Sequence, residues 1–195
     1  KAKGEDAYFL AWTTTPWTLP SNLALCVNPE ITYVKVKQGD YTYYMAKELC
    51  EKVLGEDYTI LEEMPGKSLE YKEYEPLYPY ALNKLNGKKA FIVTCDDYVT
   101  TTDGSGIVHM APAFGEDDSR VCREYGIAFV QFVDAKGCMT ADTDWPGVFV
   151  KKADPKILKD LEEKGLLLTL NIVIHIAGVA ILHFYTMHVK HGLFV

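Results

Sequence analysis

The sequence is poor in cysteine and has none of the cysteine spacings that mark a metal site or a redox pair. Its five cysteines are scattered along 195 residues and include no CxxC pair. An odd, unpaired set in a domain of this size is typical of a reduced, intracellular protein. No cysteine stands at ligand spacing to His109, the one histidine before residue 169, so no metal site is expected.

Other signatures of common enzyme classes are also missing. The chain has no GxxxxGK[ST] phosphate loop, no GxSxG nucleophile elbow and no internal repeat. Its formal charge of −7 argues against sequence-blind binding of nucleic acid through net charge, although a local cluster could still guide such a partner. With 48% hydrophobic and 24% charged residues, the composition is that of a globular protein.

The segment 169–195 differs from the rest because it lacks Asp and Glu and holds four of the five histidines. Its apolar run is interrupted by Asn171, His175 and His183 and is shorter than the ~20 residues that span a bilayer. Membrane anchoring through residues 170–187 stays an alternative, but no membrane partner is expected. The start, KAKGED, contains no Met and no apolar leader, so we expect no signal peptide and a piece of a longer protein.

Alternating and β-rich runs dominate the rest and predict an α+β or barrel-like domain with flanking helices. Strands are predicted at 7–12, 31–37, 41–46, 90–94, 106–111 and 127–132, with a hairpin turn at 38–40. Helices are predicted at about 46–54, in 115–126 and in 153–165. In the last of these, Asp154 is the expected N-cap and Pro155 the first helical residue. The stretch 64–89 is expected to be a long surface connection.

Two stretches are unusual enough to suggest a site. The first, WTTTPWTLPSN at 12–22, has three adjacent threonines and then prolines at 16 and 20. Because proline fixes the chain direction and donates no backbone hydrogen bond, we expect the hydroxyls to be held facing a cavity. Taken alone, the threonines could equally be β-forming residues at a strand end.

The second stretch, DGSGIVHMAPAFGEDD at 103–118, is a glycine-rich turn, a strand that carries His109 and a helix start that carries Asp118. Such a path could bring the imidazole and the carboxylate to one cavity rim. The local alternatives stay open: Asp117 or Asp118 can be an ordinary first-turn charge, and His109 a hydrogen-bonded core residue.

Together, WTTTPWTLPSNLALCVNP and GSGIVHMAPAFGEDD resemble the editing (CP1) domain inserted in isoleucyl-tRNA synthetase, a class I synthetase, of the eukaryotic cytosolic type. The resemblance covers about residues 1–168. The related valyl and leucyl enzymes look like TTRP in the first motif, with Arg where this chain has Thr15. One departure is Ser105, where the family usually has Thr between the two glycines.

The resemblance implies a role for each residue that matches the family's motifs. Asp118 would bind the α-ammonium of the substrate and belong to the catalytic set with Thr13, Thr14 and Thr15. Asn22 would bind substrate around the ester and the attacking water, and His109 would be the wall that rejects isoleucine. Trp12 and Trp17 would pack behind the loop.

The implied function is post-transfer editing: hydrolysis of valyl-tRNA(Ile) with isoleucyl-tRNA(Ile) spared, in the cytoplasm and without a metal or organic cofactor. The implied partners are the mischarged tRNA(Ile) acceptor end, its valine moiety and the remainder of the synthetase. Amino-acid activation is not expected, because neither HIGH nor KMSKS is present. The non-enzymatic alternative is a tRNA acceptor-end binding module that has lost hydrolysis.

The resemblance ends near Leu168, where the family continues with a segment resembling HSYPxCWRCDTPLLY. Residues 171–195 do not match it, but their degenerate back-translation, read two bases on, can spell such a segment. We therefore expect an editing domain at 1–168 and, at 169–195, an atypical tail that is the return segment read out of frame. If ordered, the tail would pack as a hydrophobic strand or helix.

Overall fold

A computed structural model describes residues 5–170 and 184–190 of the chain. The strands are β1 Tyr8–Thr13, β2 Ala24–Val27, β3 Thr32–Gln38, β4 Tyr41–Ala46, β5 Thr59–Pro65, β6 Ile92–Cys95, β7 Val108–Met110, β8 Leu167–Leu170 and β9 Phe184–Lys190. The α-helices are α1 Cys50–Leu54, α2 Glu116–Glu124 and α3 Val150–Glu163, and the 3-10 helices are η1 Pro16–Ser21, η2 Lys47–Leu49, η3 Gly66–Leu69 and η4 Pro79–Lys84.

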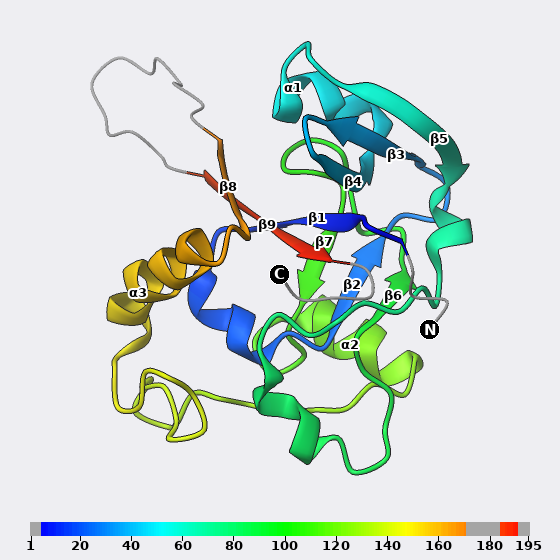
Figure 1. The fold of residues 1–195 in the computed structure, drawn as a ribbon. Helices are drawn as coiled ribbons and strands as arrows, with labels where there is room; N and C mark the ends of the chain where they lie inside the picture. The colour runs from blue at the N-terminus through cyan, green and yellow to red at the C-terminus, as the bar shows by residue number, and fades with distance from the viewer. Residues whose placement is uncertain (1–4, 171–183, 191–195) are drawn as a thin grey trace.

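All of these strands belong to one mixed sheet that is arranged around β1 (Figure 1). The order is β5-β3-β4-β1-β7-β2-β6, and β1 pairs in parallel first with β4 and then, at Trp12, with β7. Its other edge is covered antiparallel by β9, which also pairs with β8. The α+β prediction is confirmed, and β9 shows that the described part of the tail forms a strand.

The predicted hairpin is confirmed by the antiparallel pairing of β3 and β4, in which Gln38 lies opposite Tyr41. Gly39 has a φ of +55°, which explains the glycine in this turn. Predicted strands also match β1, β6 and β7, whereas β2, β5 and β8 were not predicted. All four residues of β2 are buried, so its sequence has no alternation of apolar and polar residues to reveal it.

The predicted strand at 127–132 is wrong. Ala128, Val130 and Phe132 are buried and alternate with the exposed Phe129 and Gln131, but the segment has no continuous strand partner. Its backbone bonds go to separate segments, for example from the Ala128 N–H to the Lys89 carbonyl and from the Phe132 N–H to the Ser21 hydroxyl. Alternating burial therefore arose without a sheet.

The predicted start of the last helix is also wrong, since α3 begins at Val150 and contains Pro155 internally. Phe149 is the N-cap residue, and its carbonyl accepts the Ala153 N–H at 3.0 Å. Asp154 instead accepts the backbone N–H of Trp17 at 2.8 Å. The carboxylate thus ties α3 to η1 rather than capping its own helix.

The stretch 64–89 is more than a surface connection. It contains η3 and η4 and buries Leu69, Tyr74 and Tyr78 in the apolar core. Among the helices of the described residues, none combines the length and the apolar composition needed to cross a bilayer.

Candidate functional site

The two unusual stretches meet at one cavity of about 220 Å³. The end of β1, η1, the strand β7 and the start of α2 all contribute to it. Its lining consists of Trp12, Thr13, Thr14, Thr15, Thr18, Val108, His109, Ala111, Phe114 and Asp118. These elements meet because β1 and β7 are neighbours in the sheet, with Trp12 opposite Val108.

The threonine run is the point where β1 turns into η1. Thr13 ends the strand and is buried, Thr14 is exposed and Thr15 is half-buried. The Thr13 hydroxyl accepts the Thr15 N–H at 3.1 Å, and Pro16 then starts η1. The local hydrogen bond and the proline together explain why three hydroxyls stay at the rim of a cavity instead of continuing the strand.

His109 lies at the back of this cavity, with only 7% of its surface exposed. Its Nε2 is 2.9 Å from the Thr18 hydroxyl, and its Nδ1 is 3.5 Å from the Asn22 side-chain nitrogen. Burial lowers the pKa of the imidazole to about 4, because the charged form loses its hydration. At neutral pH, His109 is therefore an uncharged wall.

Asp118 reaches the cavity from the first turn of α2. Its Oδ2 accepts the Ala111 N–H at 2.8 Å. Burial raises the pKa of this carboxyl, while the Ala111 hydrogen bond opposes the rise. The adjacent Asp117 is exposed and bonds to Arg120 at 3.2 Å, so the two neighbouring carboxylates have different environments. Among the residues that line the cavity in the described part of the chain, Asp118 alone supplies negative charge.

Asn22 does not line the cavity. Its side-chain nitrogen donates to the carbonyls of Ala24 (2.8 Å) and Met110 (3.3 Å), and its oxygen accepts the Tyr74 hydroxyl at 2.7 Å. It is 4% exposed, so every polar atom of this amide is already used inside the protein. The structure brings Asn22 next to the Nδ1 of His109 but leaves it outside the lining of the cavity.

Sequence reasoning missed Thr18. Its hydroxyl donates to the Thr15 carbonyl at 2.8 Å and bonds to His109, which joins the two motifs directly. The available signal was its position inside the first motif, three residues after Thr15, which is the spacing of a single helical turn.

The two tryptophans differ in position. Trp12 lines the cavity, and its ring closes over Gly104, where an added Cβ would lie 2.5 Å from the Trp12 Cγ. Trp17 packs edge-on against Phe114 at 4.9 Å between ring centroids. Both therefore support the cavity wall by packing.

Two larger cavities lie elsewhere and hold no comparable set of groups. One, of about 600 Å³, is lined mainly by Glu30, Lys47, Glu48 and Glu51. The other, of about 500 Å³, is mostly apolar and lies between η4 and the end of α3. Within the described part of the chain, no three His, Cys, Asp or Glu side chains are grouped so that they could hold a metal ion.

No protein-family model matches the chain. Its sequence is 49% identical over 169 residues to an isoleucine–tRNA ligase of Clostridium novyi, an alignment that covers 86% of this chain and 16% of that relative. The chain thus spans about one sixth of the length of the curated relatives it matches.

Solved structures share the fold at much lower identity. The crystal structure of GlLeuRS-CP1 superposes with a TM-score of 0.67 and 16% identity, covering 83% of each chain. The cytosolic leucyl-tRNA synthetase editing domain of P. knowlesi gives a TM-score of 0.58 and 14% identity, covering 80% of each. The predicted fold of a class I synthetase editing domain is confirmed, while the eukaryotic type stays a prediction.

Proposed function

This chain belongs to the isoleucyl-tRNA synthetase family, and from that membership we propose that it is the editing domain, which hydrolyses valyl-tRNA(Ile) and spares isoleucyl-tRNA(Ile). The observation that carries the proposal is the meeting of the threonine run, His109 and Asp118 at one cavity of about 220 Å³. These groups match what selective hydrolysis of an aminoacyl ester requires: an anion for the α-ammonium, polar groups around the ester and a wall that excludes the larger side chain.

Such a site is needed because valine and isoleucine differ very little in size. One methylene is worth only about 1–3 kcal/mol in a binding pocket, a general magnitude for which this synthetase family is itself the standard example. A second, smaller site can improve the discrimination by cleaving what fits and excluding what does not.

In the proposed step, the ionised Asp118 binds the α-ammonium of the valyl group. His109 is neutral at pH 7, so it does not repel this ammonium. Water attacks the ester carbonyl carbon, and the carbonyl π electrons move to its oxygen, where the hydroxyls of Thr13, Thr14 and Thr15 can stabilise the charge. Collapse re-forms the carbonyl and breaks the bond to the ribose oxygen, which takes up the proton that the attacking water loses, so that valine and free tRNA are released.

The wall is the His109 ring with Thr18 beside it. Because both are anchored by hydrogen bonds, the cavity cannot enlarge easily to accept one more methylene. For Asn22, the contacts favour a role through His109 rather than direct contact with the ester.

We further propose residues 1–168 as the editing domain, the cytoplasm as its location, and the tRNA acceptor end and the rest of the synthetase as its partners. The tail at 169–195 is proposed to be the family's return segment read out of frame; of it, residues 171–183 and 191–195 lie outside the described part. Sequencing the coding DNA tests this: a frame that cannot yield CWRCDTP contradicts it.

The proposed function is tested by measuring deacylation of valyl- and isoleucyl-tRNA(Ile) by this chain. Valine release with isoleucine spared is expected, and Asp118→Ala should abolish it. Asp117→Ala is the matched control, since that exposed carboxylate sits one residue away and pairs with Arg120. His109→Ala should begin to release isoleucine. A wild-type chain that binds the acceptor end but cleaves neither ester is a binding module instead.

A further inference from the structure

A chain of hydrogen bonds runs behind the cavity from Tyr74 through Asn22 to His109. We propose that Tyr74 is a positioning residue for specificity: its hydroxyl fixes the Asn22 amide, which in turn holds His109 in one tautomer and one orientation. The link to specificity rests on the proposed function, whereas the link to the tautomer does not. Tyr74 belongs to neither motif and comes from the irregular stretch between η3 and η4.

The orientation of the Asn22 amide follows from its neighbours. Its nitrogen faces two backbone carbonyls, those of Ala24 at 2.8 Å and Met110 at 3.3 Å. If the amide were flipped, its oxygen would face both carbonyl oxygens with no proton between them. The oxygen therefore faces Tyr74, and the Tyr74 hydroxyl must donate at 2.7 Å.

This orientation determines where the imidazole carries its proton. One Asn22 hydrogen points to Ala24, and the other is shared between Met110 and the Nδ1 of His109 at 3.5 Å. Nδ1 must then be unprotonated, so Nε2 carries the hydrogen and donates to the Thr18 hydroxyl at 2.9 Å. Thr18 in turn donates to the Thr15 carbonyl at 2.8 Å. Each hydrogen of the chain thus points to at least one acceptor, and the donors run in one direction from Tyr74 to the Thr15 carbonyl.

The Tyr74 hydroxyl is the start of this chain and has no role in the cavity itself. The side chain is 4% exposed and packs edge-on against Phe9 and Phe91, with ring centroids 6.4 Å and 6.0 Å away. Removing the hydroxyl would leave the Asn22 oxygen buried without its donor, while the ring would keep its packing. The amide would then be held only by its bonds to the Ala24 and Met110 carbonyls, so it could shift relative to the Nδ1 of His109 and would select the tautomer less strongly.

Nitrogen NMR of the His109 ring tests the tautomer without any substrate. In ¹⁵N-labelled wild type at pH 7, with the signals assigned by their loss in His109→Gln, we expect a neutral ring with Nε2 protonated and Nδ1 bare. Tyr74→Phe should show a mixture of both tautomers. A wild-type ring that is protonated on Nδ1, or a Tyr74→Phe ring identical to wild type, overturns the proposal.

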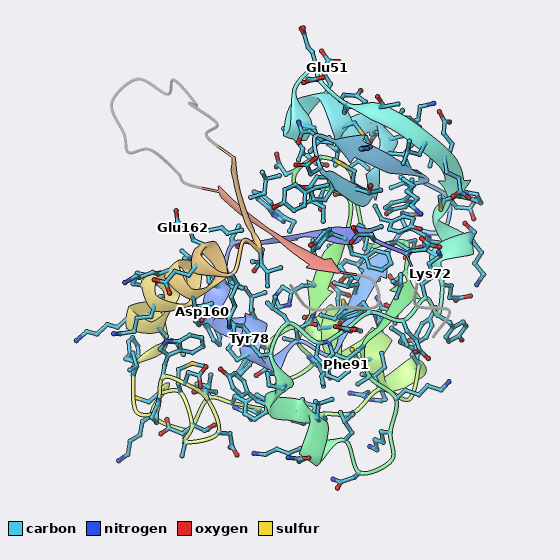
Figure 2. The ribbon with its side chains drawn as sticks, viewed as in Figure 1. Glu51, Lys72, Tyr78, Phe91, Asp160 and Glu162 are labelled. Atoms are coloured by element: carbon cyan, nitrogen blue, oxygen red, sulfur yellow. The ribbon has the colours of Figure 1, made fainter. Side chains whose placement is uncertain are left out.

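Discrimination is measured on the same variants. Tyr74→Phe should lower the ratio of kcat/KM for valyl-tRNA(Ile) over isoleucyl-tRNA(Ile) about tenfold, through faster release of isoleucine, which corresponds to the loss of one buried hydrogen bond. Tyr78→Phe is the matched control, because Tyr78 is also 4% exposed and its hydroxyl donates at 2.9 Å to Asp160 on α3 instead of to Asn22; Figure 2 labels both residues. The control should keep the wild-type ratio and tautomer.

The two readouts separate the failure of this inference from that of the proposed function. If the wild-type chain cleaves neither ester, the proposed function is refuted, yet the tautomer comparison still decides whether Tyr74 positions His109. A changed tautomer with an unchanged discrimination ratio overturns the specificity role. Equal loss of discrimination in both tyrosine variants would show that any buried cavity loosens the site, and would also overturn it.

Discussion

Gly115 stands immediately before α2, and its missing side chain leaves the room in which the Asp118 carboxylate lies. Its φ of −132° and ψ of 140° suit any residue, so alanine would fit the backbone without strain. An added Cβ, however, would lie 2.8 Å from the Asp118 Cγ and 2.9 Å from Oδ1. Ordinary contact begins at 3.4 Å, so the carboxylate of Gly115→Ala must move by several tenths of an ångström.

That displacement weakens the hydrogen bond from the Ala111 N–H, which is 2.8 Å long in the native site. A hydrogen bond to a charged group contributes about 1.5–3 kcal/mol. If the carboxylate also leaves the position that binds the substrate ammonium, kcat/KM for valyl-tRNA(Ile) should fall about 10- to 100-fold. The free energy of unfolding should change by only about 1 kcal/mol, because the lower entropy of unfolded alanine offsets part of the lost bond.

The assay is deacylation of valyl-tRNA(Ile), with urea unfolding measured on the same samples. Asp118→Asn supplies the control: if Gly115→Ala acts through Asp118, the double variant should be no slower than Asp118→Asn alone. A folded Gly115→Ala with wild-type kcat/KM, or a double variant whose two losses multiply, would refute the reasoning.

Three further outcomes are expected. Gly104→Ala should lower the free energy of unfolding by at least about 2 kcal/mol in urea, because φ is +77° and the Cβ meets the Trp12 ring; a loss below about 1 kcal/mol would contradict this close packing. Hydrogen bonds from Tyr44 and then Lys35 lower the pKa of Glu5 from 4.5 to about 2, so its stabilisation is complete above pH 4.5, declines below that pH and is lost as pH falls through about 2. Glu5→Gln should therefore cost about 1 kcal/mol at pH 7, a value reduced for partial exposure, and much less near pH 2; a pH-independent difference would exclude the ion pair as its cause. Because burial raises the pKa of Asp118, valyl-ester cleavage should decline as pH falls through a value above 3.8, and an acid limb at or below 3.8 would argue against Asp118 as the ammonium anchor.

Much of the local structure could be predicted from the sequence. Gly39 indicated the β3–β4 hairpin. The acidic residues of the first turn and Gly126 just after the last turn indicated α2. Both predictions succeeded because glycine torsions and helix-end charges act over a few residues. The strand predicted at 127–132 failed for the converse reason. Its alternating burial depends on whatever packs on each side chain, and that pattern does not reveal whether a partner strand exists.

The sequence by itself determined the two motifs, the order in which they occur and the chemistry that they carry. The threonines followed by proline, and the spacing between His109 and Asp118, are set by the covalent sequence and are therefore the same in any fold of this chain. Only the tertiary structure decided that Asn22 faces Tyr74 and His109, that Thr18 joins the two motifs and that Asp154 holds Trp17 instead of a helix end. These partners lie 52 to 137 residues apart. No local propensity selects contacts at such separations, because they form only when the packing of the whole core brings the side chains together.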